Sequence, residues 1–427
     1  MQKLQGTLFF IFFFLSVFAN AQSYEKLHYL IDSIVYEAIN QEAFPGCVVY
    51  ASKADSLFFL KSYGHHTYDS IRRVAVNDIY DLASITKVVG GTLAMMKLYE
   101  DDHIDLEDEI RDHIDKLGRK VGRVTFREAL AHQGGLYPWI PYHQESRRKN
   151  GKFRNRTVSD QLDEDYPFPL SDSLYLHSDF YSRIKKMIRK SDVSDEKKYR
   201  YSGLFFYLIP ELVKNLTDTS YQTYLETHFY EPLQASTLTF NPLEKFAREQ
   251  IVPTEIDTFF RMEPIHGKVH DEGAIMMKGI SGNAGLFSNA EDLAKVFNLF
   301  INNGKVDSVV LLKPQTIQLF TTAQYPNNQN RRGLGFDMPL LEYDSIRSSV
   351  ARSASFRSFG HTGYTGTLAW GDPENELIFV FLTNRVYPSR TKRALYELNV
   401  RPSIHQVLYD YLNGGLRENT DPVEITK

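Results

Sequence analysis

Strand-like patterns lie near both ends of this chain, whereas its long middle is patterned for helices. Residues 47–51 and 56–60 predict the two strands of a hairpin. Towards the other end, strands are expected at residues 333–338, 366–370 and 377–383, the last of these almost wholly apolar. Such an arrangement favours one sheet built from both ends of the chain, with a helical insertion packed against it.

Apolar residues recur at helical spacing in several further segments. Helices are expected at residues 27–39, 124–130, 199–216, 221–232 and 290–301, and from Pro402 onwards. The chain contains no internal repeat that we can detect. About 400 residues can bury a large core, and the two ends need each other to complete the sheet. We therefore expect one composite domain.

The first 21 residues are typical of a secretory signal peptide. A charged start is followed by the apolar run 8–18 and by the small residues Ala19 and Ala21 in an Ala-x-Ala pattern. The apolar run is too short to span a bilayer as a helix. We expect cleavage near Ala21, export to the periplasm or the medium, and no transmembrane segment in the mature chain.

Charge gives no bulk attraction to nucleic acid, because the net charge is −4 and the pI is about 6.4. Residues 143–198 are highly charged, but basic and acidic groups follow one another and compensate. A solvated insertion, able to act as a lid beside a cleft, is favoured there over a nucleic-acid patch. The role of this insertion is not readable from its sequence.

Ser84 and Lys87 are the strongest sign of a catalytic site in this sequence. They form a Ser-x-x-Lys motif at the start of a helical run. Residues three apart on a helix face the same side. A serine hydroxyl needs a nearby base to become a good nucleophile, and a lysine in a dry pocket can serve once it is neutral. The start of a helix also offers N–H groups to a developing oxyanion.

Spacing alone does not select Ser84. The same motif also begins at five other serines, Ser23, Ser146, Ser182, Ser194 and Ser389. Taken by itself, Ser84 could cap a helix while Lys87 is solvated.

Other catalytic chemistries find less support in the chain. No Gly-x-Ser-x-Gly elbow accompanies a Ser/His/Asp arrangement, and Gly267 between His266 and His270 disfavours a helical metal-binding face. No metal or other cofactor is therefore expected. Cys47, the only cysteine, lies in a predicted strand and is interpreted as a core residue.

Two further motifs follow the Ser84 motif along the chain and single out Ser84 among the six serines. Tyr201-Ser202-Gly203 opens a predicted helix in the middle region, and residues 360–366 (Gly-His-Thr-Gly-Tyr-Thr-Gly) precede a strand near the end. With Ser84 and Lys87, this order resembles the serine β-lactamase / penicillin-binding-protein superfamily. The class C β-lactamase-related hydrolases and esterases are the most similar branch. Residues 131–136, 269–274 and 382–388 also resemble motifs of that branch, including a bacterial group in which the domain is fused to a β-N-acetylglucosaminidase.

The resemblance implies an α/β sandwich, with an antiparallel sheet from both chain ends flanked by helices, plus an all-helical lobe. By that reading residues 22–427 form one domain after the signal peptide 1–21. The α/β lobe would comprise about 22–80 and 275–413, the helical lobe about 81–274, and a polar tail 414–427.

The same resemblance implies roles for individual residues. Ser84 would form an acyl-enzyme, and Lys87 and Tyr201 would share the acid and base work. The backbone N–H groups of Ser84 and Tyr364 would form an oxyanion hole, and His361, Thr362 and Gly363 would line the strand edge that holds the substrate.

Two departures from the family pattern bear on the substrate. Gly203 stands where the family usually has Asn or Asp, so an amide that would hold a substrate amide and support Lys87 is missing. His361 stands where true β-lactamases often have Lys, and neutral imidazole attracts a carboxylate less.

We therefore expect an exported serine hydrolase that acts on an ester, a cell-wall peptide or a related amide. A true β-lactamase is one alternative. A degenerate penicillin- or peptidoglycan-binding protein without turnover is another. The expected partner is a small-molecule or cell-wall peptide substrate, not nucleic acid, and the oligomeric state is not readable.

Overall fold

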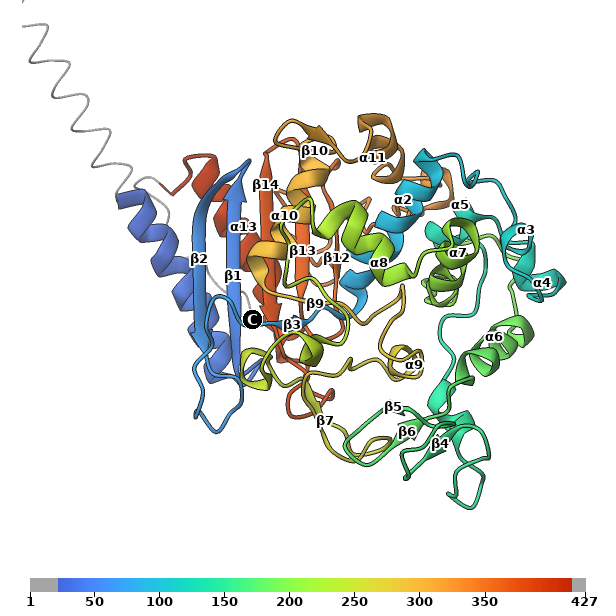
Figure 1. Ribbon diagram of the computed structural model, residues 1–427. Coiled ribbons are helices and arrows are strands. Elements are labelled where there is room, and N and C mark those ends of the chain that lie inside the picture. Colours follow the sequence, from blue (N-terminus) through green and yellow to red (C-terminus); the bar gives the residue numbers. More distant parts are fainter. Residues whose placement is uncertain (1–21, 417–427) are drawn as a thin grey trace, which may run out of the picture.

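A five-stranded antiparallel sheet forms the centre of the protein, whose computed structural model describes residues 22–416 (Figure 1). The strand order is β12-β13-β14-β1-β2. The strands span β1 Gly46–Lys53, β2 Ser56–Gly64, β12 Phe359–Thr362, β13 Leu368–Asp372 and β14 Leu377–Thr383. The predicted hairpin and the expectation of one sheet from both chain ends are both confirmed.

The two ends of the chain meet where β1 pairs with β14. The register runs from Cys47 opposite Thr383 to Lys53 opposite Leu377. Every residue of β14 is buried, as its apolar run predicts for a central strand. Cys47 is fully buried in this pair, and burial raises the pKa of its thiol well above the usual range.

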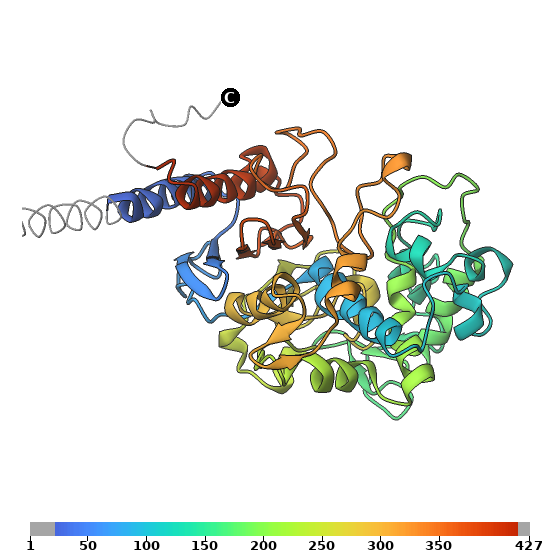
Figure 2. The same cartoon turned by 90° about the horizontal axis from the view of Figure 1, so that it is seen from above.

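Two long helices cover one face of the sheet. The N-terminal helix, described from residue 22 to residue 40, and α13 (Val400–Leu412) lie side by side there (Figure 2). Ile31 and Leu408 pack with Phe379 in one apolar cluster. Alternate residues of β14, such as Val380, belong instead to the core on the opposite face.

On that opposite face, α10 (Ala290–Ile301) packs on β13 and β14, and beyond it lies a mostly helical lobe (Figure 1). Its helices are α2 Leu93–Glu100, α3 Ile110–His113, α4 Arg119–Gly122, α5 Phe126–Leu130, α6 Phe180–Lys190, α7 Ile209–Thr217, α8 Tyr221–Leu225 and α9 Glu272–Ile275. Two more helices, α11 Pro314–Phe320 and α12 Ala394–Glu397, belong to the C-terminal part of the chain.

Short strand pairs tie loops together around these layers. They are β3 Tyr80–Asp81 with β9 Phe287–Ser288, β7 Glu255–Ile256 with β8 Pro264–Ile265, and β10 Lys305–Val306 with β11 Val309–Val310. A three-stranded sheet joins β4 Val158–Ser159, β6 Tyr175–Leu176 and β5 Phe168–Pro169.

The charged insertion 143–198 is anchored in the main core. It contains the β4-β6-β5 sheet and α6, whose Phe180, Ile184 and Ile188 are buried with the other residues of the helical lobe. Three basic residues of α6, Lys186, Arg189 and Lys190, are exposed on its outer side, as expected of a solvated face. This packing fits an insertion that has no core of its own.

Two predicted elements are wrong. Residues 333–338 do not form a strand and make only one bridge, between Asp337 and Gly360. Gly335 turns the chain there with a φ of +82°, and a side chain at this position would collide with Thr92. Residues 199–216 are likewise not one helix, because α7 starts only at Ile209, next to Pro210.

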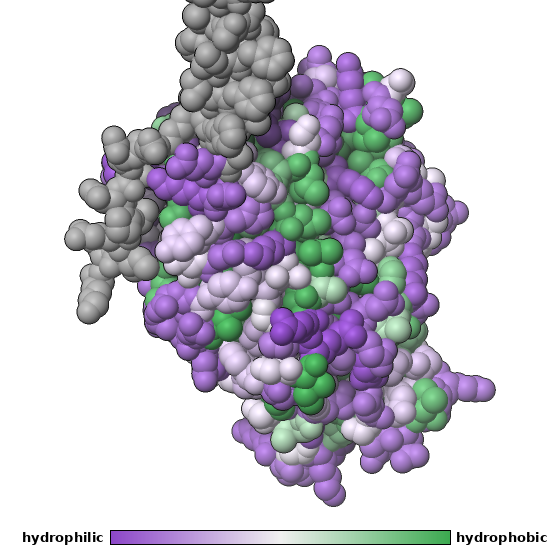
Figure 3. Space-filling model, turned by 90° about the vertical axis from the view of Figure 1, so that its left-hand side faces the viewer, coloured by the Kyte–Doolittle hydropathy of each residue, from purple (hydrophilic) through white to green (hydrophobic). Residues whose placement is uncertain are grey.

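Figure 3 shows the face that carries β2 and the N-terminal helix. Hydrophobic residues gather there in a narrow column among predominantly hydrophilic and intermediate residues. Across residues 22–416, no helix combines the length and the apolar character needed to cross a membrane. The predicted signal peptide, residues 1–21, lies outside the described residues.

Candidate active site

Ser84 follows β3 on a sharply bent backbone. Ala83 adopts a φ of +46°, an unusual value for a residue with a side chain. Asp81 holds this bend, because its carboxylate accepts the N–H of Ala83 at 2.8 Å and that of His270 at 2.7 Å. The pKa of the Asp81 carboxyl is raised, because the effect of burial is larger than that of the hydrogen bonds, which act to lower it. The bend presents Ser84 at the start of a helical run.

That run is not a regular helix at first. A single 3-10 turn at Ala83–Ile85 is followed by a π-helical segment at Lys87–Thr92, and α2 begins at Leu93. Every side chain of the π-helical segment is buried. π-Turns of this kind are frequent at functional sites, where they reposition side chains.

Lys87 lies beside the hydroxyl of Ser84. Its Nζ donates to Ser84 Oγ at 3.0 Å and to the backbone oxygen of Asn283 at 2.9 Å. Lys87 is only 2% exposed, and within residues 22–416 it forms no ion pair with a carboxylate. The only groups that hold it are therefore uncharged.

Lysines of other Ser-x-x-Lys motifs are engaged differently. Lys185 pairs with Glu211, Lys197 with Glu128, and Lys392 with Glu42. A lysine paired with a carboxylate is held in its charged form. The geometry thus separates the Ser84 motif from these three.

Tyr201 lies next to Lys87, as the sequence predicts. The Lys87 Nζ is 5.3 Å from the centre of the Tyr201 ring, and that ring is 4.6 Å from the ring of His132. Among the described contacts, no hydrogen bond joins the Tyr201 hydroxyl to Ser84 or Lys87. Tyr201 precedes α7 on an extended segment, where its neighbour Ser202 donates to the carbonyl of Tyr137 at 2.6 Å.

His132 is a site residue whose role the sequence did not reveal. It is fully buried behind Tyr201, and its Nδ1 accepts the N–H of Ser202 at 3.3 Å. Burial lowers the pKa of His132 well below its usual range, with help from the charges of Arg332 and Lys87. Its position in the turn at residues 131–136 was the available signal.

His361 on β12 faces the same group of residues. Its ring centre is 6.0 Å from that of Tyr201, and its Nε2 is 3.2 Å from Nη1 of Arg332. Arg332 also pairs with Asp337 at 3.3 Å. Burial, and then the charges of Arg332 and Lys87, lower the pKa of His361 to about 3. Sequence patterns gave no sign of Arg332, which immediately precedes the segment 333–338 that was mistaken for a strand.

The turn after β12 packs directly on the Ser84 bend. Thr365 Oγ1 donates to the carbonyl of Asp81 at 2.9 Å, and Thr367 Oγ1 to that of Leu82 at 3.3 Å. A Cβ on Gly363 would lie 2.6 Å from the Leu82 oxygen, so only glycine permits this approach. Thr362 and Gly363 therefore lie beside the Ser84 segment.

Tyr364, the fourth predicted residue of this turn, points outwards. Its side chain is 49% exposed and stacks 5.8 Å from the ring of His270, while Arg385 lies over the ring at 4.9 Å. His270 and Glu255 are joined at 2.7 Å, and Glu255 also binds Arg390. Burial acts to raise the pKa of Glu255, but the hydrogen bonds of His270 and Arg390 lower it to about 2.

The two histidines considered as metal ligands have separate partners. Nε2 of His266 contacts the carbonyl of Ile251 at 2.6 Å, whereas Nε2 of His270 contacts Glu255. Within residues 22–416, no three His, Cys, Asp or Glu side chains are grouped so that they could hold a metal ion.

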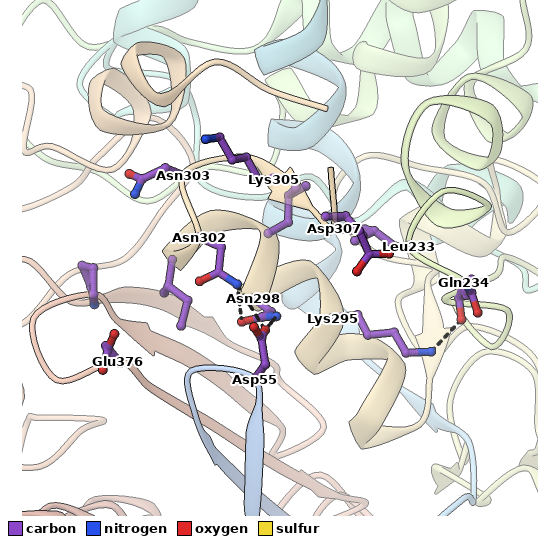
Figure 4. A pocket seen from close by; sticks show the side chains of 14 residues that line it. Asp55, Leu233, Gln234, Lys295, Asn298, Asn302, Asn303, Lys305, Asp307 and Glu376 are labelled. Carbon is purple, nitrogen blue, oxygen red and sulfur yellow. Dashed lines mark hydrogen bonds between the residues drawn. The ribbon is translucent and has the colours of Figure 1, made fainter. Parts of the chain in front are cut away.

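A cavity of about 810 Å³ lies elsewhere, between α10 and the turn that joins β1 to β2 (Figure 4). Its polar groups largely satisfy one another: Asn302 donates to Asp55 at 3.2 Å, and Lys295 to the carbonyl of Gln234 at 2.6 Å. Neither Ser84 nor any other predicted site residue lines it. The chemistry indicated by the sequence is therefore not located there.

Comparison with known proteins gives consistent matches. The family model described as Beta-lactamase matches residues 31–401. A Salmonella heidelberg protein named "Putative D-alanyl-D-alanine carboxypeptidase" is 30% identical over 389 residues, which covers 84% of this chain and 83% of that protein.

Solved structures with a similar fold include two hydrolase-like proteins. EstCE1, described as a hydrolase with promiscuous acyltransferase activity, matches with a TM-score of 0.64 at 16% identity, over 90% of this chain and 99% of that one. An octameric penicillin-binding protein homologue from Pyrococcus abyssi matches with a TM-score of 0.62 at 19% identity, over 90% and 77% of the two chains. At these identities, the two structures establish the common fold.

Proposed function

This chain belongs to the β-lactamase family of serine hydrolases, and we propose that it cleaves a peptide or an ester through an acyl-enzyme on Ser84. The observation that carries the proposal is the 3.0 Å contact between Ser84 Oγ and Lys87 Nζ. It joins a nucleophile to a buried base that no carboxylate engages among the described residues. The site would lie where the lobe of residues 22–80 and 275–413 meets the lobe of residues 81–274.

The proposed chemistry has two steps. In acylation, Lys87 takes the proton of Ser84, Oγ attacks the substrate carbonyl, and the leaving amine or alcohol departs with a proton delivered through Lys87 and Tyr201. In deacylation, Lys87 and Tyr201 take a proton from water as it attacks the ester carbonyl. The bond between this carbon and Ser84 Oγ then breaks, the acid product leaves, and the proton passes to Oγ. The N–H groups of Ser84 and Tyr364 would stabilise the oxyanion in both steps.

A peptide that ends in a D-amino acid is the substrate class we favour. The 30% identical Salmonella heidelberg protein carries a carboxypeptidase name, and its match spans most of both chains. Neutral His361 supplies no charge to the terminal carboxylate of such a peptide, so the preference rests on this relative and not on His361. An ester substrate remains compatible with the same chemistry.

The proposal includes export. Residues 1–21 have the charged start, apolar run and Ala-x-Ala pattern of a signal peptide. A periplasmic or secreted hydrolase would meet cell-wall peptides directly. The intact mass of the protein recovered from the periplasm or the medium would test this, because it should correspond to a chain that begins at Gln22.

Labelling with a fluorophosphonate tests the proposed nucleophile. We expect one covalent adduct on the wild type, none on Ser84→Ala, and one on Ser182→Ala, a matched control with the same Ser-x-x-Lys spacing on the exposed side of α6. Absence of any adduct on the wild type would contradict hydrolysis and favour a binding protein without turnover. A lasting penicillin adduct, or rapid loss of the drug, would separate a penicillin-binding protein from a β-lactamase.

A further inference from the structure

Gly203, two residues after Tyr201, lies where a side-chain carbon would fit without a collision. A Cβ built on Gly203 would lie 3.7 Å from Tyr207 and 3.9 Å from the Cβ of Asn283, which are ordinary contact distances. No positive φ requires glycine at this position. The position that a Cβ would take is therefore not occupied by a neighbour; we call it the Gly203 space, and Asn283 borders it.

Asn283 has a side-chain donor, Nδ2, that forms no hydrogen bond with the described residues 22–416. The residue is 5% exposed, and its Oδ1 accepts from Ser281 Oγ at 2.6 Å. Its backbone oxygen accepts from Lys87 at 2.9 Å. Within residues 22–416 the Nδ2 of Asn283 has no hydrogen-bond partner. This Nδ2 is not one of the enclosed, unpaired side-chain atoms of the described residues, so it borders solvent and is available to a bound ligand.

Two contacts fix the loop that carries Asn283, one beside Lys87 and one on the segment that follows Gly203. The N–H of Leu286 donates to Thr86 Oγ1 at 3.2 Å, next to Lys87. A Cβ on Gly282 would lie 2.6 Å from the carbonyl of Phe206, so the loop packs tightly on the segment after Gly203. Asn283 is thus held between Lys87 and the Gly203 space by contacts that do not involve its own Nδ2.

We propose that Asn283 is a substrate-binding residue, whose Nδ2 donates to an amide carbonyl on the acyl side of the scissile bond, in the space left by Gly203. This rests on the proposed function. It narrows the substrates to acylated peptides and N-acylamino esters, which carry such a carbonyl, as opposed to simple alkyl esters. Asn283→Ala would remove the donor and keep the backbone oxygen that binds Lys87.

Two esters with the same leaving group test the proposal. N-acetylglycine p-nitrophenyl ester offers an acyl-side amide, and p-nitrophenyl butyrate does not. We expect Asn283→Ala to reduce kcat/KM for the amide ester about tenfold more than for butyrate. A tenfold difference is roughly what the loss of one hydrogen bond produces. Asn298→Ala, in the separate cavity beside α10, should leave the ratio of the two kcat/KM values unchanged.

A double variant tests whether side chains at positions 203 and 283 reach the same space. Gly203→Asn placed on Asn283→Ala should restore the preference for the amide ester, because the new side chain enters the same space from the other side. Equal losses on both esters, no loss on either, or no recovery in the double variant would overturn the proposal.

These results are separable from failure of the proposed function itself. A wild type that hydrolyses neither ester and takes up no fluorophosphonate would contradict the serine hydrolase. A wild type that does both, with an Asn283→Ala variant that shows no selective loss, would contradict only the role of Asn283.

Discussion

Nη1 of Arg332 lies 3.2 Å from Nε2 of His361, and Nδ1 of the same ring lies 2.7 Å from the carbonyl of Thr362. A guanidinium can only donate and a carbonyl can only accept, so the ring is neutral with its proton on Nδ1. His361 therefore contributes shape and a hydrogen-bond acceptor to the strand edge, and not a positive charge.

The pH dependence of stability should reveal this neutral histidine. An unfolded chain binds a proton on His361 near pH 6.5, whereas burial and Arg332 lower the pKa in the folded protein to about 3. The stability that the neutral ring contributes is therefore complete above pH 6.5 and is lost as the pH falls towards 3.

We expect His361→Gln to reduce the pH dependence of the free energy of unfolding between pH 4 and 6. One proton corresponds to at most about 1.4 kcal/mol in the free energy of unfolding per pH unit. Urea denaturation at several pH values would measure the slope for both proteins. His132 contributes in the same direction, so some slope should remain in the variant. Equal slopes for wild type and variant would contradict a neutral His361.

Replacement of Lys87 should slow acylation strongly without loss of the fold. Lys87→Ala removes the base, and we expect the fluorophosphonate labelling rate to fall about 10²–10⁴-fold. Lys87→Arg keeps a cation but cannot release its proton, so its rate should be similarly low. Circular dichroism would confirm that both variants are folded. A Lys87→Arg variant that labels at the wild-type rate would exclude Lys87 as the base.

Tyr201→Phe tests the hydroxyl separately from the ring. The ring contacts with His132 and Lys87 should persist, whereas proton transfer through the hydroxyl is lost. We expect kcat to fall about 10²-fold or more. Tyr199→Phe, two residues away with its ring 5.7 Å from Arg332, is the matched control and should change kcat less than twofold. Equal effects of the two changes would show that Tyr201 has only a packing role.

Gly363→Ala should disturb the contact between the β12 turn and the Ser84 bend. The added Cβ would lie 2.0 Å from Thr367 Oγ1 and 2.6 Å from the Leu82 oxygen, so the segments must separate. We expect a loss of about 1–3 kcal/mol in the free energy of unfolding, together with lower activity. Gly203→Ala, where the added Cβ meets only ordinary contacts, should lose less than about 1 kcal/mol. Thermal unfolding of both variants would measure the difference.

Local patterns predicted most of the sheet because its strands are strongly apolar, but the short edge strand β12 was not expected as a strand. The run at β14 and the hairpin of β1 and β2 were recognisable, and α10 has the predicted bounds. The strand predicted at residues 333–338 is absent because Gly335 takes a left-handed conformation, which its packing against Thr92 requires. No local sequence pattern reveals such a contact.

The proposed site was only partly predictable for the same physical reason. Ser84 and Lys87 are neighbours on one turn, so their spacing alone indicated a common side. Asn283 and Arg332 come to Lys87 and His361 from segments far apart in the sequence. Their proximity depends on the tertiary fold. From the sequence, only the family resemblance distinguished Ser84 from five identical spacings, and the structure separates it from three of them.

Capture of the acyl-enzyme tests the central proposal most directly. The protein would be mixed with N-acetylglycine p-nitrophenyl ester, quenched in acid and digested with trypsin, which releases residues 74–87 as one peptide. We predict the added mass of the acyl group on Ser84 in that peptide, and its absence in Ser84→Ala. Turnover of the ester with no acylated peptide, or with the acyl group on another residue, would contradict the proposal.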